Sequence, residues 1–234
     1  MNNVLPLFGL LLLTFTMTAF AAPTTDISGI WGMATLQGDL NFISPDLTSF
    51  QWLISSQTGE REDSAKGLRL NEAILLGQVG YQVNKHVTFW LGYLDDRIHP
   101  LNKLSYEESR PYQDVVYTQT VADFNLTIRT RLEERINQAN SDIGYRVKQF
   151  FQINHALPFI DGLSGYLNND TYFYVNQTNF GKQGFSENRF GSGLSYQFTK
   201  QLGADLGYLQ QYVDNKTGSN LLINNLQMNL RYRF

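Results

Sequence analysis

The chain has 234 residues, a formal net charge of −3 at pH 7 and no cysteine. The lack of cysteine excludes a disulfide framework, a lipid-modified cysteine, thiol metal ligands and a thiol nucleophile. Acidic and basic residues are interspersed, so nothing predicts a nucleic-acid partner, and 14% aromatic residues with 19 glycines favour a single β-rich domain.

The first segment is an apolar run from Val4 to Phe20, which ends in a small-x-small pattern closing at Ala21. We predict a signal peptide over residues 1–21, cleaved after Ala21, and one mature domain over residues 22–234. A retained membrane helix is the alternative, but the run is short and no basic stop-transfer cluster follows it. No later segment is apolar for long enough to span a bilayer as a helix, so a membrane domain would have to be a closed barrel.

Segments with alternating side chains follow one another along the mature chain. Eleven segments read as strands: 30–40, 47–55, 68–83, 86–94, 112–122, 126–136, 144–154, 166–175, 189–198, 202–212 and 226–234. A bacterial barrel with both chain ends in the periplasm needs an even number of strands. We therefore predict an all-β, antiparallel, up-and-down transmembrane β-barrel of 12 strands, in which a turn at residues 37–39 adds a short strand, with 10 strands as the alternative.

The connections between these segments differ in length and polarity. Asp95–Pro111 and Asn176–Ser186 are long and polar, which predicts loops outside the cell. Asn84-Lys85 and Thr199-Lys200 are tight turns, which predicts that they face the periplasm because short turns are periplasmic in such barrels.

Two further features of the strands and loops concern membrane contact and metal binding. Trp31 and Trp52 are candidate anchors at the membrane interface. Asp95, Asp96 and His99 have the donor types of a divalent-cation site, but a solvated loop is the simpler interpretation, and we predict no metal and no cofactor.

Residues 126–136 show the two faces of a strand most clearly. Leu126, Ile128, Leu132 and Ile136 alternate with Arg129, Arg131, Glu133 and Arg135. We interpret the apolar face as lipid-facing and the charged face as lining a wet lumen. The inward charged residues predicted across the clearest strands are Arg129, Arg131, Glu133, Arg135, Arg146, Lys148, Asp170, Arg189, Asp205, Arg231 and Arg233.

Most of these inward residues are positive, although the whole chain is negative. Inward-facing glycines on the last strands are expected to leave free space inside the barrel: Gly191, Gly193, Gly203 and Gly207. Space and a positive field together favour a passage for anions. The alternative is that interior Arg and Glu side chains pair with one another and fill the barrel.

The loop 137–142 predicts a hairpin in which Ile136 lies opposite Ile143. This register places Glu133 opposite Arg146 and Arg131 opposite Lys148, with all four side chains inward, whereas a slip of one residue would pair inward with outward positions. The like-charged pair needs an anion or an acid such as Asp170 beside it. Arg131 and Lys148 are accordingly expected to be dispensable for folding.

The last strand ends in Leu-Arg-Tyr-Arg-Phe, with Tyr232 and Phe234 on its apolar face. A terminal Phe with an aromatic residue two positions before it resembles the carboxy-terminal signal of outer-membrane barrels. The resemblance implies that the barrel-assembly machinery recognises Tyr232 and Phe234.

Several motifs occur in order along the chain: GYQV at 80–83, E-x-R-P-Y-Q at 108–113, R-x-R-L-E-x-R at 129–135, YRV at 145–147 and the terminal RYRF. In these motifs the chain resembles the bacterial outer-membrane β-barrel family catalogued as domain of unknown function 2490. The resemblance covers most of the mature chain and implies a barrel fold. It brings no established activity and no catalytic residues.

The function predicted first is a small diffusion channel, or porin, with a cationic lumen for small anionic solutes, located in the outer membrane. A non-conducting structural or surface-interaction barrel is the alternative. A lipid-modifying enzyme is less favoured, because His86, His99 and His155 lie at turns or in a loop and none lies mid-strand on a polar face. The expected partners are outer-membrane lipid, lipopolysaccharide and the barrel-assembly machinery.

Overall fold

The computed structural model describes residues 23–234 apart from 64–65, 102–103 and 216–217, so the predicted signal peptide lies outside the described residues. The strands of the described part are β1 (Thr24–Asp39), β2 (Phe50–Asp63), β3 (Gly67–Gln82), β4 (Val87–Ile98), β5 (Tyr106–Val121), β6 (Phe124–Asn137), β7 (Ile143–Ala156), β8 (Leu163–Tyr174), β9 (Gly184–Gln197), β10 (Leu202–Val213) and β11 (Asn220–Arg233). Two 3₁₀ turns, η1 (Leu40–Phe42) and η2 (Pro45–Leu47), join β1 to β2. None of the described helices is long and apolar enough to span a bilayer.

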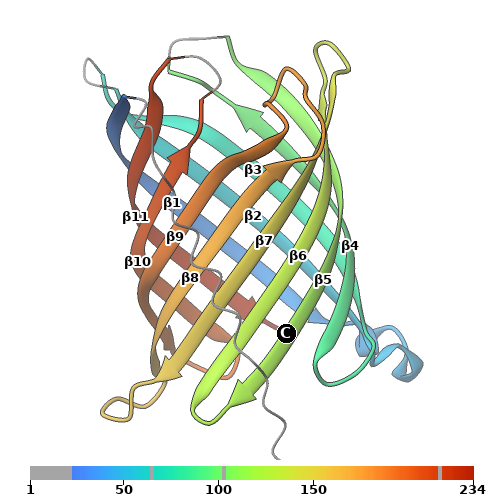
Figure 1. Cartoon of the computed structure of the whole chain (residues 1–234). Coiled ribbons are helices and arrows are strands. Elements are labelled where there is room, and N and C mark those ends of the chain that lie inside the picture. The colour runs from blue at the N-terminus through green and yellow to red at the C-terminus, as the bar shows by residue number, and fades with distance from the viewer. Residues whose placement is uncertain (1–22, 64–65, 102–103, 216–217) are drawn as a thin grey trace, which may run out of the picture.

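The strands form one closed barrel in which each strand pairs with its neighbours in sequence, antiparallel throughout except at the closure (Figure 1). At the closure β1 pairs with β11 in parallel, with Thr24 opposite Asn220 and Gln37 opposite Arg233. The described residues thus contain eleven strands, and the predictions of 12 and of 10 are both wrong. No turn forms at residues 37–39, because they continue β1 and pair with β2 as far as Asp39 opposite Gln51.

An odd number of strands is possible here because the barrel closes in parallel. The first strand starts at the end of the barrel where β11 also starts, so Thr24 and the carboxy-terminal Phe234 lie at opposite ends. The predicted even number assumed that both chain ends lie on the same side. That assumption, and not the recognition of the strands, was the error.

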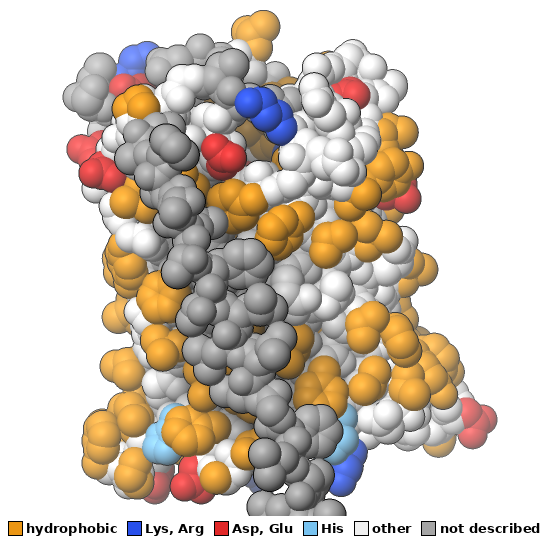
Figure 2. Space-filling model, in the orientation of Figure 1, with side chains coloured by type: hydrophobic (Ala, Val, Ile, Leu, Met, Phe, Trp, Pro, Cys, Tyr) orange, Lys and Arg blue, Asp and Glu red, His pale blue; other side chains and the backbone are white. Residues whose placement is uncertain are grey.

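The outer wall is apolar over most of its height. Figure 2 shows hydrophobic side chains over the wall, and Lys, Arg, Asp and Glu side chains near the two ends. Outward residues include Leu91, Leu206 and Leu194, which are 66%, 58% and 51% exposed. A soluble protein rarely leaves so many large apolar side chains exposed together. The outward and inward sets alternate as predicted for 126–136.

The two tryptophans predicted as interface anchors differ in their orientation. Trp52 points outward near the end of the barrel that holds Phe234, and the two rings lie 5.5 Å apart. Trp31 instead points into the barrel and is 5% exposed, so its assignment as an anchor is wrong. Inside, its ring lies against Gly59, where a Cβ would clash with it.

The predicted long loops and tight turns lie at opposite ends, although the connection 40–49 between β1 and β2 lies at the same end as the tight turns. The described residues 99–101, 104–105 and 175–183 lie at one end, here called the loop end, and the turns 83–86 and 198–201 lie at the other, the turn end. The predicted loop Asp95–Pro111 is too long, because β4 continues to Ile98 and β5 already begins at Tyr106. Likewise β9 begins at Gly184, within the predicted loop Asn176–Ser186.

The hairpin of β6 and β7 has the predicted register. Ile136 lies opposite Ile143, Glu133 opposite Arg146, and Arg131 opposite Lys148. The predicted register is confirmed, and a slip of one residue would have carried these charges outside and the apolar residues inside.

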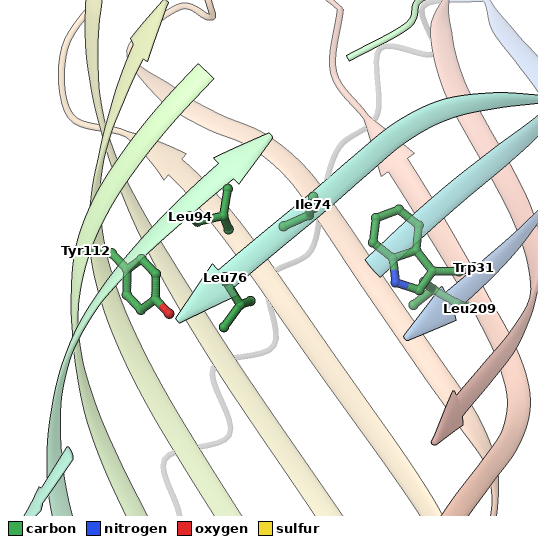
Figure 3. Packing of buried hydrophobic residues seen from close by; sticks show 6 residues of the cluster. All are labelled: Trp31, Ile74, Leu76, Leu94, Tyr112 and Leu209. Carbon is green, nitrogen blue, oxygen red and sulfur yellow. The ribbon is translucent and has the colours of Figure 1, made fainter. Parts of the chain in front are cut away.

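Buried side chains lie on the inner face of every strand. Every strand contributes at least one inward residue that is less than 9% exposed, and we call this set the waist: Trp31, Ser55, Leu76, Leu94, Tyr112, Glu133, Arg146, Tyr172, Glu187, Leu209 and Asn225. Six buried apolar residues form a cluster on one side of this band (Figure 3): Trp31, Ile74, Leu76, Leu94, Tyr112 and Leu209. A side chain that lined a water-filled passage would be exposed, so the waist is packed.

The parallel closure can be tested by crosslinking. Ala34 lies opposite Leu230, both outward, and neighbouring strands are about 4.8 Å apart, within the range that a disulfide bridges. We expect Ala34→Cys with Leu230→Cys to form a disulfide in the folded protein. Ala34→Cys with Leu226→Cys should not, because the second cysteine is displaced by about 13 Å along β11. Failure of the first pair on non-reducing gels would contradict the parallel closure.

Candidate functional site

Buried ion pairs join β5, β6 and β7 on the inner wall. Arg131 binds both carboxylate oxygens of Asp114, with Nε to Oδ1 and Nη2 to Oδ2 each at 2.6 Å. Arg135 binds Glu108 in the same bidentate manner, with Nε to Oε2 at 2.8 Å and Nη2 to Oε1 at 2.6 Å. Two-pronged pairs of this kind are the strongest protein ion pairs, and here their partners come from the alternating inward positions of adjacent strands.

The third pair lies across the confirmed hairpin. Arg146 donates from Nε to Glu133 Oε1 at 2.6 Å, and its Nη2 contacts the same oxygen. Glu133 is 1% exposed and Arg146 is 5% exposed. Charges this deeply buried persist only when paired, because the loss of their hydration has to be offset by a close partner.

All eleven predicted lumen residues point inward, and each has an ion-pair partner. Beyond the three pairs above, these are Arg129 with Asp170 at 3.6 Å, Lys148 with Asp170 at 4.0 Å, Arg189 with Glu187 at 2.5 Å, Arg233 with Asp39 at 3.7 Å, and Arg231 with Asp205. Asp170 therefore lies beside Lys148, as the like-charged register required. Arg131, however, neutralises the buried Asp114. This contact disagrees with the prediction that Arg131 is dispensable for folding.

Sequence reasoning missed seven charged residues of the interior: Arg61, Glu72, Asp96, Glu108, Arg110, Asp114 and Glu187. Most of them fell in stretches that were interpreted as loops because of their polarity. A usable signal was present, since Glu108, Arg110, Tyr112 and Asp114 recur every second residue, the period of a strand. Because five of the seven are acids, they offset most of the positive excess predicted for the interior.

A second charged group lies around Arg110. Its guanidinium contacts Glu108 at 2.7 Å and lies 2.5 Å from Asp96 Oδ2. Asp96 points inward while Asp95 points outward, and His99 hydrogen-bonds to Ser105 at 2.8 Å. The three residues weighed as a cation site are thus separated, and the described residues contain no cluster of three potential metal ligands.

Aromatic rings connect the charged groups across the interior. The guanidinium of Arg131 lies 3.6 Å from the ring centre of Tyr112. Arg189 on β9 lies 4.9 Å from the ring of Trp31 on β1, and 5.1 Å from Tyr172 on β8. Since β10 and β11 separate β9 from β1 along the wall, Arg189 reaches over two strands to make this contact.

The loop end holds a cavity of about 830 Å³ above the waist. Six cations and three acids line it: Arg61, Arg110, Arg135, Arg146, Lys182, Arg189, Glu72, Glu187 and Asp214. Aromatic and aliphatic residues complete the wall, including Tyr106, Tyr174, Phe180, Phe185, Ile98 and Leu101. A pocket of this size and mixed lining is of the kind that holds small molecules.

Two of the three histidines lie away from this cavity, and His99 lies between the lining residues Ile98 and Pro100 without lining the cavity itself. His86 contacts the carbonyl of Thr118 at 2.9 Å, and the ring of His155 lies 4.7 Å from that of Phe124, both near the turn end. None of them lines the cavity. The described side chains of the cavity therefore offer binding groups and no nucleophile with a histidine base beside it.

Together these features define, in the described part of the chain, a closed, eleven-stranded β-barrel with an apolar outer wall, a charged interior, and a cavity at the loop end. Residues 28–221 match the family described as "Protein of unknown function (DUF2490)", and the chain belongs to this family. An uncharacterized protein of Methylorubrum extorquens is 26% identical over 171 residues, which cover 71% of this chain and 74% of the relative. No solved structure gives a significant match.

The pair of Glu133 and Arg146 allows a stability test. We expect Glu133→Ala to lower the free energy of unfolding by about 3–5 kcal/mol, because it leaves Arg146 buried without its partner. Urea unfolding of the detergent-solubilised barrel would measure this. Glu134→Ala, on the outward face of the same strand, is the matched control and should change stability by less than about 0.5 kcal/mol. Equal effects of the two substitutions would contradict a structural role for the pair.

Proposed function

We propose that this protein is an outer-membrane β-barrel that does not conduct solutes and that acts through the surface it exposes at the loop end. The observation that carries the proposal is the waist, in which all eleven strands place a buried side chain inside the barrel. A diffusion channel needs a continuous water-filled path, which keeps the lumen-facing side chains exposed. The packed waist supports a closed interior.

The state of the interior charges supports the same conclusion. Selectivity filters present charges that are free to meet an ion. Here Arg131 and Arg135 are held by buried carboxylates in two-pronged pairs, so their field is largely cancelled within the wall. Buried, mutually neutralised pairs hold strands in place and attract little from solution.

A cationic channel is the second candidate, because arginines do line the cavity and glycines do face inward on β9 and β10. The space beside these glycines is occupied, however. Side-chain atoms of Tyr166 lie where a Cβ on Gly193 or Gly207 would be, and Asn168 and Gln197 lie over Gly191 and Gly203 in the same way. The glycines make room for neighbouring side chains, which weakens the argument for a channel.

Placement in the outer membrane rests on the predicted signal peptide and on the exposed apolar wall. Its partners would be outer-membrane lipid and lipopolysaccharide along this wall. The barrel-assembly machinery would recognise Tyr232 and Phe234, whose rings lie 4.8 Å apart at the turn end. The short turns at this end would face the periplasm.

Conductance across planar bilayers tests the closed waist. We expect the wild-type protein to give no stable channel openings. Trp31→Ala combined with Leu209→Ala removes two large side chains of the waist and should produce openings. Trp52→Ala, on the outer wall, is the control for loss of a tryptophan and should stay silent.

Folding of each variant is checked by the heat-dependent gel migration typical of intact barrels. This check ensures that a lack of conductance does not result from misfolding. Anion-selective openings of the wild-type protein would overturn the proposal in favour of the cationic channel.

Orientation is tested by protease treatment of intact cells. We expect cleavage between β4 and β5 and between β8 and β9, because the described residues of these connections, 99–101, 104–105 and 175–183, lie at the loop end. The turns 83–86 and 198–201 should be cut only after the outer membrane is permeabilised. The opposite pattern would invert the orientation.

A further inference from the structure

We propose that the cavity at the loop end is a binding site for a small organic anion, one that carries a carboxylate or phosphate group on a ring. This inference rests on the proposed function, since the packed waist is the floor of the cavity. The cavity volume of about 830 Å³ is in the range of small-molecule sites.

The acids and the cations are arranged at different depths. Asp96, Glu108 and Glu133 are at most 1% exposed and do not line the cavity, whereas their partners Arg110, Arg135 and Arg146 do. The carboxylates thus lie behind the guanidiniums as seen from the cavity. The surface that a ligand meets is therefore more positive than the interior as a whole.

Of the six cations that line the cavity, Arg61 and Lys182 have no ion-pair partner among the described residues, and Arg61 is the one on the barrel wall. It lies on β2, faces the cavity, and makes no hydrogen bond or ion pair with any of the described residues. Its acidic neighbours Glu72 and Glu187 lie beyond ion-pair distance. Glu187 is already bound by Arg189 at 2.5 Å and by Gln211 at 2.7 Å. A guanidinium with unused donors is suited to a carboxylate or phosphate, which it can bind through two parallel hydrogen bonds.

The opposite wall provides surfaces for a ring. The loop after β8 places Phe180 and Lys182 at the cavity, and Arg135 lies 4.6 Å from the ring centre of Phe180. Gly181 lies so close to Tyr174 that a Cβ there would clash with the ring. Aromatic faces beside cations suit a ligand that combines a flat body with an anionic group.

Isothermal titration of the purified full-length barrel with phenyl phosphate tests the site. We expect binding of phenyl phosphate, weaker binding of inorganic phosphate, which lacks the ring, and no binding of benzyl alcohol, which lacks the charge. Equal binding of benzyl alcohol, or no binding of phenyl phosphate, would overturn the proposal.

Substitutions then assign the binding to the cavity. Arg61→Gln should weaken phenyl phosphate binding by about tenfold, the effect of losing one charge-assisted hydrogen bond. The same substitution should leave the free energy of unfolding unchanged, because it breaks no ion pair or hydrogen bond. Lys182→Gln should weaken binding as well. Arg97→Gln, an exposed arginine on the outer face of β4 that does not line the cavity, is the matched control and should bind normally. Binding that neither Arg61→Gln nor Lys182→Gln weakens would also overturn the proposal.

The same anionic chemistry occurs in free solutes and in lipid headgroups. Titration in phosphatidylcholine nanodiscs with and without phosphatidylglycerol separates the two sources: competition by the anionic lipid assigns the site to a headgroup, and unchanged affinity assigns it to a free solute. Conductance is measured separately. A wild-type barrel that conducts while its binding depends on Arg61 would refute the closed waist alone, whereas a silent barrel that does not bind would refute the site alone.

Discussion

The fold depends on opposite charges that meet inside the barrel on adjacent strands. Arg131 with Asp114 and Arg146 with Glu133 are buried in the sheet that also presents an apolar face outward. A slip of one residue between two neighbouring strands would set the inward charges of one strand against outward positions of the other and break the pairs between them. Burying ions gains little net stability, but it makes every alternative register much worse. In this barrel the charged interior therefore selects the arrangement of the strands.

The same interactions explain why the interior is full. Long arginine side chains lie over aromatic rings, as Arg189 does over Trp31 and Tyr172, and their stems cover apolar surface while their heads reach carboxylates. Glycine occurs where a large inward side chain lies against the backbone, as Trp31 does at Gly59. Above Arg135 and Arg146 the packing opens into the cavity at the loop end.

Much of this structure could be predicted from the sequence, because alternation is a local signal. The face assignments and the β6–β7 register follow from residues a few positions apart, and they are confirmed. The closure was missed because the pairing of β1 with β11 is set by contacts about 200 residues apart. Asp96, Glu108 and Arg110 were wrongly predicted to lie in a solvated loop because the surrounding sequence is polar. The sequence alone does not distinguish a buried charged residue from an exposed one. The cavity and the unpaired Arg61 arise only when distant strands are brought together.

The parallel pairing of the first and last strands has a consequence for how the barrel is built. The ten antiparallel pairs are hairpins between consecutive strands and can form early, whereas the pair of β1 and β11 requires the whole chain to be in place. Such a long-range contact is slow to form, because the entropy of closing the chain has to be lost before the contact is gained. Until then the sheet is open, and it carries two unpaired edges at which other chains could add. The closing strands therefore set the time during which this protein needs protection from aggregation.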